Sequence, residues 1–258
     1  MKLFIKLSYR GTNYAGYQIQ KNAPTIQQKL NQATKELFGF DCDIVGCSRT
    51  DSGVHANEFC ATISAKGTDG IETNISEKSL PLALCAHLPE DISINEARWV
   101  RSDFHPRYDV KYKEYLYRLW KRPQRNPFVP DMCYHYPRTI DDSTLEKMDR
   151  AAKEFCGEYD FSAYMAKGGN PTDTVRCVKY ASVTRNGDFI EFRVAADGFL
   201  YNMVRIMTGT LLSVAENKIA PEDIKSITLS KDRKKAGITA AACGLFLNKV
   251  EYGEDIYV

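Results

Sequence analysis

Apolar positions along the chain follow two different periods. Apolar residues at every second position indicate strands, and apolar residues three and four positions apart indicate helices. In the first part of the sequence, this pattern predicts a strand at 3–9, strands on both sides of residue 51 and a strand at 92–100. It also predicts a helix at 26–37, which follows a capping box of Thr25 and Gln28 and stops before Gly39, and a helix at 77–88. The predicted order is β-α-β-β-α-β.

The remainder of the chain repeats this order. The pattern predicts two helices, a short third helix after Pro221, a hairpin that turns at Asn186-Gly187, and a strand at either end. The predicted strands are 110–120, 175–184, 189–195 and 244–250, and the predicted longer helices are 143–155 and 200–215. We therefore expect an α+β protein of two ferredoxin-like subdomains, residues 1–103 and 104–258, whose strands form a mostly antiparallel mixed sheet with a central cleft.

Composition narrows the class of protein. With 258 residues, 43% hydrophobic and 26% charged, the chain is typical of a folded globular protein and not of a disordered one. Its first residues alternate charged and apolar positions without the apolar core of a signal peptide, and no apolar run could span a bilayer, so we expect a cytoplasmic protein. The eight cysteines form no Cys-x-x-Cys pair and do not cluster with the four histidines, which predicts reduced, mostly buried thiols and no metal site.

The segment 47–56 contains the candidate chemistry, with the single carboxylate of Asp51 between Arg49 and Gly53. Small and polar residues next to glycine favour a tight turn between the two flanking strands. The nearby guanidinium of Arg49 would favour the ionised carboxylate, as a nucleophile or a general base requires. The residues alone allow a second interpretation, in which Asp51 only caps a structural turn.

This segment resembles the Gly-Arg-Thr-Asp-Ala-Gly-Val-His-Ala signature of the tRNA pseudouridine synthase A family, whose aspartate is the catalytic carboxylate. Ser48 and Ser52 replace a glycine and an alanine of that signature. Tyr17 stands where the family commonly has tryptophan, and residues 241–243 replace a segment that commonly contains proline. Further matches to the family follow in order along the chain, at 9–20, 104–108, 113–117, 198–205 and 244–247.

The resemblance implies the pseudouridine synthase fold and a role for several further residues. Tyr115 aligns with the active-site tyrosine, Arg205 with the arginine that contacts the catalytic aspartate, and Leu245 with a substrate-binding position of the terminal motif. By itself, Tyr115 on an amphipathic strand would be a packing residue. Arg205 is more informative, because a charge on an apolar helix requires an anionic partner, for which we expect Asp51.

The implied activity is the isomerisation of uridine to pseudouridine at positions 38–40, in the anticodon stem-loop of tRNA. The reaction exchanges one bond to the base for another, so we expect no cofactor and no metal. Arg49 would occupy the space that the flipped base leaves. Basic residues at 121–125 would bind the RNA, with further clusters at 111–113 and 231–235, any of which can also be an ordinary solvated face. The predicted RNA contacts of the first cluster are Lys121, Arg122 and Arg125.

The predicted partners are tRNA and a second copy of the chain, and no membrane. We expect a homodimer because the family that the sequence resembles is dimeric in bacteria, because no appended RNA-binding domain is evident, and because a net charge of +2 is small for binding a whole tRNA. Two other functions remain compatible with the residues. A non-catalytic RNA-binding module would explain the tyrosines and lysines, and a carboxylate-dependent nucleoside glycosidase would use Asp51, although it usually needs a second carboxylate.

Overall fold

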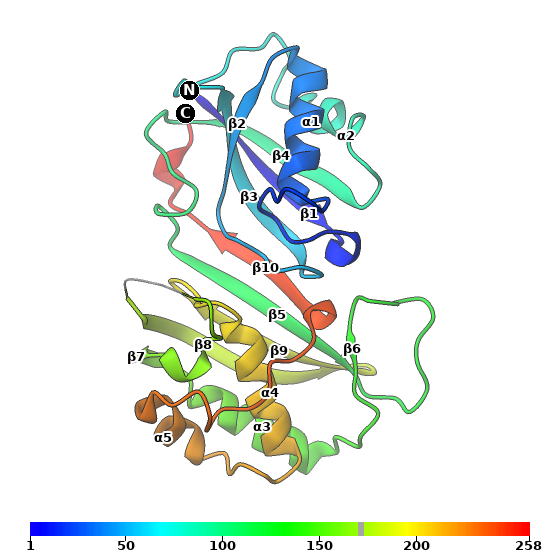
Figure 1. Ribbon diagram of the computed structural model, residues 1–258, viewed down its shortest axis with the longest axis vertical. Helices are drawn as coiled ribbons and strands as arrows, with labels where there is room; N and C mark the ends of the chain where they lie inside the picture. Colours follow the sequence, from blue (N-terminus) through cyan, green and yellow to red (C-terminus); the bar gives the residue numbers. More distant parts are fainter. Residues whose placement is uncertain (170–172) are drawn as a thin grey trace. The chain divides into compact units, whose positions relative to one another are not determined.

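A computed structural model of the chain describes residues 1–169 and 173–258. Its contacts divide the chain into two compact units, one of residues 1–111 with 247–258 and one of residues 112–246 (Figure 1). The first unit begins with six elements in the order β-α-β-β-α-β, which confirms the prediction for this part of the sequence. They are β1 (Lys2–Tyr9), α1 (Ile26–Phe38), β2 (Cys42–Gly46), β3 (His55–Ala65), α2 (Leu80–Cys85) and β4 (Ile92–Val100).

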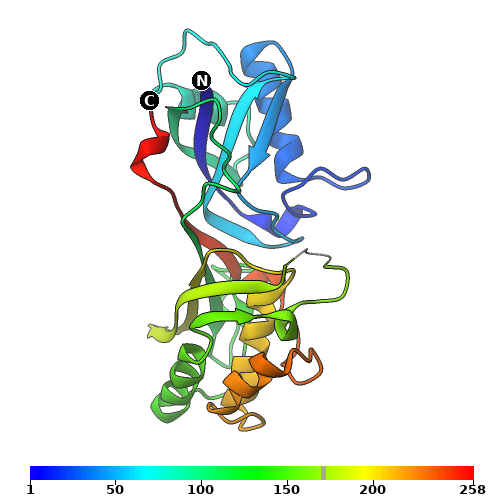
Figure 2. The same cartoon turned by 90° about the vertical axis from the view of Figure 1, so that its left-hand side faces the viewer.

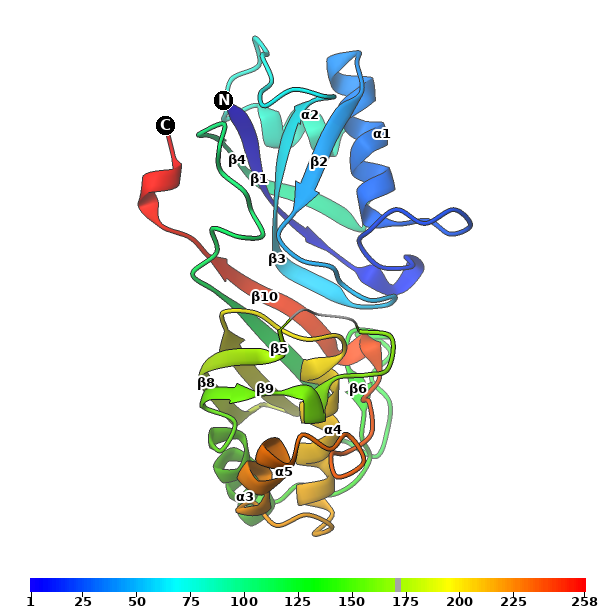
Figure 3. The ribbon, with the colours of Figure 1, turned by 60° about the vertical axis from the view of Figure 1, so that its left-hand side comes forward.

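The strands of the first unit are antiparallel and follow the order β4-β1-β3-β2. β1 is central, so that Leu3 pairs with Ile63 on one side and with Trp99 on the other. Leu3, Ile5 and Leu7 point to the same face of this strand, and all three are inaccessible to solvent. α1 contacts α2, and the two helices pack on β2 and β4 respectively (Figure 3).

Helix α1 has the ends that the sequence predicts. The Thr25 hydroxyl accepts a hydrogen bond from the Gln28 amide at 3.3 Å, and Gly39 ends the helix in the left-handed conformation at φ 79°. Helix α2 is shorter than the predicted 77–88, so that prediction was wrong at both ends. The Glu77 carboxylate accepts a hydrogen bond from the Trp99 amide of β4, and the amides of His87 and Leu88 bond three residues back, in tighter turns.

The second unit contains a sheet in the order β5-β9-β8-β7, and all of these pairs are antiparallel. One short strand, β6, pairs parallel with the end of β5, and α3 and α4 lie side by side (Figure 2). The α+β class with a mixed, mostly antiparallel sheet is thus confirmed. The elements are β5 (Tyr112–Trp120), β6 (Tyr134–His135), α3 (Asp142–Lys153), β7 (Gly157–Asp160), β8 (Val175–Asn186), β9 (Phe189–Ala196), α4 (Met203–Ala215) and α5 (Asp223–Ser230).

Local signals explain which of these elements the sequence predicts. The hairpin closes at Asn186 and Phe189, with Gly187 at φ 58°, as the Asn-Gly pair indicates. The fourth helix begins at Met203 and not at Leu200, because Asn202 adopts a left-handed conformation at φ 61°. β6 and β7 have two and four residues, too few for a period to be recognised, and they were not predicted.

The chain returns to the first unit along β10 (Leu245–Glu251). The Lys111 amide donates a hydrogen bond to the Glu251 carbonyl at 2.8 Å, and the Val250 amide donates one to the Glu58 carboxylate at 3.0 Å. The Tyr252 ring lies edge-on to Phe4 at 5.7 Å. The last residues of the chain therefore belong to the core of the first unit.

Two further findings concern membrane-spanning helices and the cysteines. In the part of the chain that the structure describes, no helix has both the length and the apolar character needed to cross a membrane. All eight cysteines lie in this part and carry free thiols, but only three of them are buried and five are half-buried, so the expectation of mostly buried thiols was wrong.

Candidate active site

Asp51 lies in the turn that joins β2 to β3, where the sequence predicts it. The Cys47 amide bonds the Cys60 carbonyl at 2.8 Å, and the turn closes where the Val54 amide bonds the carbonyl of Asp51 itself at 3.1 Å. Gly53 has φ 77°, a conformation that favours glycine. Asp51 is half-buried, so its carboxylate is partly withdrawn from water while the backbone around it is fixed.

A second segment, residues 9–17, holds this turn. The hydroxyls of Tyr9 and Thr50 share a buried hydrogen bond of 2.8 Å. The Tyr17 amide donates to the Thr50 carbonyl at 3.2 Å, and the Gly53 amide donates to the Tyr14 carbonyl at 3.3 Å. The residues on both sides of the candidate carboxylate are thus bonded to one neighbouring loop, which limits the positions that the carboxylate can take.

Two glycines let the segments approach so closely. A Cβ atom at Gly11 would lie 2.0 Å from the Val54 carbonyl oxygen, and one at Gly16 would lie 2.4 Å from the Thr50 carbonyl oxygen. The Gly11 amide donates to Nδ1 of His55 at 3.0 Å, so the neutral ring carries its proton on Nε2. The sequence shows these residues as part of a family motif, but only the structure shows that they support the Asp51 turn.

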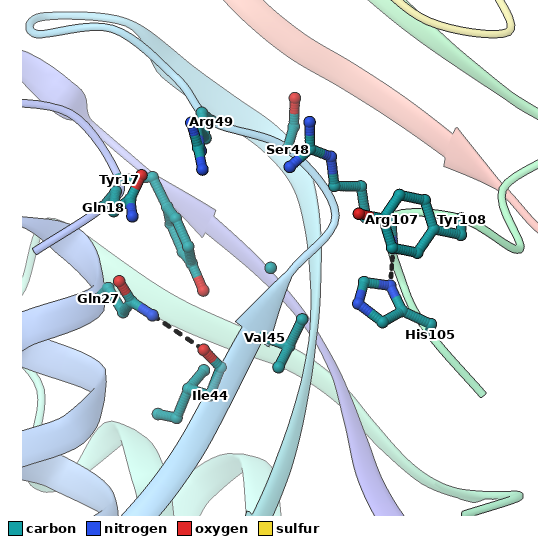
Figure 4. A pocket seen from close by; sticks show the side chains of 11 residues that line it. Tyr17, Gln18, Gln27, Ile44, Val45, Ser48, Arg49, His105, Arg107 and Tyr108 are labelled. Atoms are coloured by element: carbon teal, nitrogen blue, oxygen red, sulfur yellow. Dashed lines mark hydrogen bonds between the residues drawn. The ribbon is translucent and has the colours of Figure 1, made fainter. Parts of the chain in front are cut away.

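Arg49 does not pair with Asp51, although only Thr50 separates them in the sequence. Throughout residues 1–169 and 173–258, no carboxylate oxygen lies within 4.0 Å of the exposed Arg49 side chain. The guanidinium instead lines a pocket of about 260 Å³ in the first unit (Figure 4). β2, the start of the Asp51 turn, the loop at 17–18 and the segment 105–108 form its walls. The lining residues are Tyr17, Gln18, Gln27, Ile44, Val45, Gly46, Ser48, Arg49, His105, Arg107 and Tyr108.

Tyr115 lies on β5 of the second unit, opposite Val194 of β9. It is buried, with 6% of its surface exposed, and its ring lies edge-on to Phe199 at a centroid distance of 4.9 Å. This contact restricts the orientation of the Tyr115 ring. Leu245, the first residue of β10, is similarly buried at 5%.

Arg205 lies in the first turn of α4 and is half-buried. Its Nε donates a hydrogen bond to the Ala240 carbonyl at 2.7 Å, and its Nη1 donates to Oδ1 of Asn202 at 2.7 Å. Both of these acceptors are neutral, and they help to orient the guanidinium. Asn202 was not recognised from the sequence, where an asparagine directly before the apolar helix is the only signal.

The predicted RNA-binding cluster at 121–125 lies on the surface. Arg125 is exposed and Lys121 is half-buried, whereas Nε of Arg122 bonds Oδ1 of Asp188 at 2.8 Å. The same loop, which continues to the start of β6 at Tyr134, also contains Phe128, which is 91% exposed. An exposed aromatic ring near cations is compatible with RNA binding.

In the cluster at 231–235, more of the basic side chains make contacts within the second unit than in the cluster at 121–125. Lys231 pairs with Asp160 at 3.0 Å, and Arg233 donates a hydrogen bond to the Gly237 carbonyl at 2.8 Å. Only Lys234 and Lys235 remain exposed without a carboxylate partner among the described residues. In the same part of the chain, no group of three His, Cys, Asp or Glu side chains could hold a metal ion.

Comparison with known proteins identifies the family. A family model described as "tRNA pseudouridine synthase" matches residues 151–253. The chain is 42% identical to "tRNA pseudouridine synthase A" of Thermoanaerobacter sp. (strain X514), over 97% of this chain and 99% of that protein. It is 41% identical to the protein of the same name from Acetivibrio thermocellus, over 98% and 99% of the two chains. "tRNA pseudouridine synthase A 2" of Clostridium tetani is 40% identical over 96% and 97%.

Among solved structures, the chain is similar to one titled "Crystal Structure of a Cbf5-Nop10-Gar1 Complex", with a TM-score of 0.36 and 12% identity, over 96% of this chain and 59% of that one. The family assignment does not depend on this weak similarity. Because the identity to the sequence relatives extends over nearly the whole length, the protein belongs to the tRNA pseudouridine synthase A family and is an enzyme of the tRNA pseudouridine synthase class.

Proposed function

We propose that the protein converts uridine to pseudouridine at positions 38–40, in the anticodon stem-loop of tRNA, with Asp51 as the catalytic carboxylate. The observation that carries this proposal is the Asp51 turn, whose Thr50 and Gly53 are bonded to residues 9–17. Such support keeps a reacting group in position at no cost during the reaction. The substrate class is supported by a relative named "tRNA pseudouridine synthase A", to which the chain is 42% identical over nearly its whole length.

The chemistry requires a carboxylate but no redox partner. The N1 glycosidic bond breaks, the uracil turns, and C5 bonds to the ribose carbon, while C5 loses one proton and N1 gains one. Asp51 would act as a nucleophile on the ribose or the base, or as a base that removes a ribose proton. Either role requires the ionised form, which a neighbouring cation favours, and we assign that cation to Arg205.

The remaining assignments concern the base itself. Tyr115 would stack on the uracil and accept the C5 proton, and Leu245 would pack against the same base. Stacking on an aromatic ring contributes about 1–3 kcal/mol per base. Arg49 would fill the gap in the RNA after the target base is extruded, and its exposed side chain without a carboxylate partner among the described residues supports this role. The protein would meet its tRNA substrate in the cytoplasm.

Incubation of the purified protein with an unmodified tRNA transcript tests the activity. We expect pseudouridine at positions 38–40 when the product is mapped, with unchanged RNA mass and an intact strand. Loss of uracil would instead identify a nucleoside glycosidase, and binding without chemical change would identify an RNA-binding module. A chelator should leave the rate unchanged.

Asp51→Asn tests the catalytic assignment. The amide keeps the shape of the side chain, so the variant should bind tRNA normally and lose at least a thousandfold in turnover. Asp41→Asn is the matched control, because Asp41 is an exposed aspartate of the same unit that pairs with Lys35 at 3.0 Å. A loss of tenfold or less for Asp51→Asn would correspond to about 1.4 kcal/mol of barrier and would contradict a covalent or proton-transfer role.

A further inference from the structure

The pocket beside the Asp51 turn has a lining that favours an anion. None of its eleven lining residues is acidic, and both Arg49 and Arg107 line it (Figure 4). In the part of the chain that the structure describes, neither group has a carboxylate oxygen within 4.0 Å. Two cations in one concave site, without internal neutralisation, favour binding of a phosphate.

The pocket also offers an aromatic surface. The rings of His105 and Tyr108 lie against each other at a centroid distance of 4.3 Å, and Tyr108 is 73% exposed. Nδ1 of His105 accepts a hydrogen bond from the Arg107 amide at 3.2 Å, so the neutral ring carries its proton on Nε2 and can donate it. The Asp109 carboxylate accepts a hydrogen bond from the His105 amide at 2.7 Å. Aromatic rings together with arginines are typical of sites for unpaired nucleotides.

Size and position limit the occupant. A pocket of about 260 Å³ is smaller than the roughly 300–1,000 Å³ of sites for drug-sized ligands, so it has room for no more than one nucleotide. Arg49, which lines the pocket, precedes Asp51 by two residues. Two residues span at most about 7 Å, which equals about two steps of 3.4 Å along a nucleic-acid strand.

We propose that this pocket binds an unpaired nucleotide of the substrate RNA that lies one or two positions from the target uridine, with its phosphate at Arg107 and its base against Tyr108. The proposal rests on the proposed function, because it assumes an RNA substrate at Asp51. Extrusion of the target base exposes its neighbours, and a pocket that holds one of them fixes the register of the strand and hence selects which uridine reaches the carboxylate.

The test measures affinity in the absence of turnover. The Asp51→Asn protein is titrated with a set of anticodon stem-loop RNAs, each of which carries one abasic nucleotide. The abasic nucleotide, which keeps its phosphate, is placed in turn at each of the two positions on either side of the target uridine. At one of these positions, removal of the base should raise the dissociation constant about tenfold. In the background of Tyr108→Ala, the same removal should change it less than twofold, and Tyr108→Phe should behave like tyrosine.

The phosphate contact has its own measurement. Arg107→Ala should reduce the slope of log K against log salt concentration by about 0.7, the contribution of one single-strand phosphate. Arg101→Ala is the matched control, because Arg101 is an exposed arginine of the same unit that lies outside the pocket and faces Asp103 at 3.5 Å. That control should leave the slope unchanged.

The outcomes separate this proposal from the proposed function. If the wild-type protein forms no pseudouridine, the proposed function fails, whatever the binding data show. If it does form pseudouridine but no abasic position is coupled to Tyr108, the pocket does not read a neighbouring base and the inference is overturned. The third outcome is that inorganic phosphate competes with the RNA and Arg107→Ala weakens binding, while no abasic position has an effect. That outcome would identify a simple anion site and would also overturn the inference.

Discussion

Two tyrosines of the segment that supports Asp51 differ in the hydrogen bonding of their hydroxyls. The Tyr9 hydroxyl bonds Thr50 at 2.8 Å. The Tyr17 ring stacks on Phe59 at 4.3 Å, but its buried hydroxyl has no hydrogen-bond partner among the described residues. Burial therefore raises the pKa of Tyr17 above its ordinary value. An unsatisfied buried hydroxyl costs about 1–3 kcal/mol, so this group lowers the stability of the first unit.

The same substitution at these two positions should have opposite effects. Tyr17→Phe removes the unsatisfied hydroxyl, keeps the stack and should raise the free energy of unfolding by about 1 kcal/mol. Tyr9→Phe leaves the Thr50 hydroxyl without this partner and should lower it by about 1 kcal/mol. Urea unfolding of both variants beside the wild type provides the measurement. Equal destabilisation by the two changes would show that the Tyr17 hydroxyl is satisfied in solution.

The Tyr115 hydroxyl can be separated from its ring. Tyr115→Phe keeps the aromatic face against Phe199 and should bind tRNA normally while it forms pseudouridine more slowly, because the acceptor of the C5 proton is gone. Tyr115→Leu should weaken both binding and turnover. Single-turnover rates and dissociation constants measured on the same tRNA separate these effects. If the Phe variant turned over as fast as the wild type, Tyr115 would serve only as a stacking surface.

The loop of residues 10–17 is the element on which the geometry of the Asp51 turn depends. Gly16 has φ 89°, and a Cβ atom there would lie 2.4 Å from the Thr50 carbonyl oxygen. Gly67 has a similar φ of 75°, but a Cβ atom there would meet nothing within 4 Å. The two glycines therefore separate backbone strain from displacement of the turn.

Gly16→Ala should inactivate the enzyme more than it destabilises the fold. Both Gly16→Ala and Gly67→Ala introduce the strain of a left-handed alanine, about 1–2 kcal/mol. Only Gly16→Ala also pushes the backbone next to Asp51, so its turnover should fall at least tenfold while Gly67→Ala keeps the wild-type rate. Thermal unfolding and initial rates of the two variants provide the comparison. Equal rates would mean that the loop tolerates the displacement without moving the carboxylate.

The same elements show what a sequence pattern can predict. Helix α1 and the β8–β9 hairpin were predicted because a capping box, a terminal glycine and an Asn-Gly turn act locally. The ends of α2 and the start of α4 were not, because a bond from Glu77 to β4 and the left-handed Asn202 decide them. The strands β6 and β7 depend on pairing partners and carry no period of their own.

The candidate site follows the same rule. The turn around Asp51 was predicted from its own residues, and its chemistry from the family resemblance. The pocket was not predicted, because its walls come from residues 17–18, from β2 and from 105–108, which only the tertiary structure brings together. Similarly, the support of Thr50 by Tyr9 and Gly16 spans more than thirty residues of sequence.

The charge of the protein bears on how a whole tRNA is bound. The net charge is only +2, and part of the basic surface is used internally, since Lys231 and Arg122 pair with aspartates. Non-specific affinity for nucleic acid depends on the number of phosphates that cations neutralise. A second copy of the chain would double the number of exposed cations available to one tRNA, which supports the expected homodimer.

We predict that the protein acts as a homodimer in which one tRNA contacts both chains. The test mixes two inactive variants after joint denaturation and refolding. One carries Asp51→Asn, and the other carries Lys121→Glu with Arg125→Glu. Arg122 is left intact because a glutamate there would face Asp188 and disturb the loop. In a mixed dimer, the intact Asp51 of one chain can use the intact basic cluster of its partner, so activity should return.

Arg150→Glu with Lys225→Glu provides the matched control for the charge reversal, because it changes two exposed basic residues of the same unit that lie outside the predicted RNA-binding clusters. This variant should remain active on its own. Light scattering establishes the oligomeric state, and a monomer would refute the prediction directly. Mixtures that stay inactive although mixed dimers are present would show that Lys121 and Arg125 serve the Asp51 of their own chain, because complementation requires the two functions to act across the dimer.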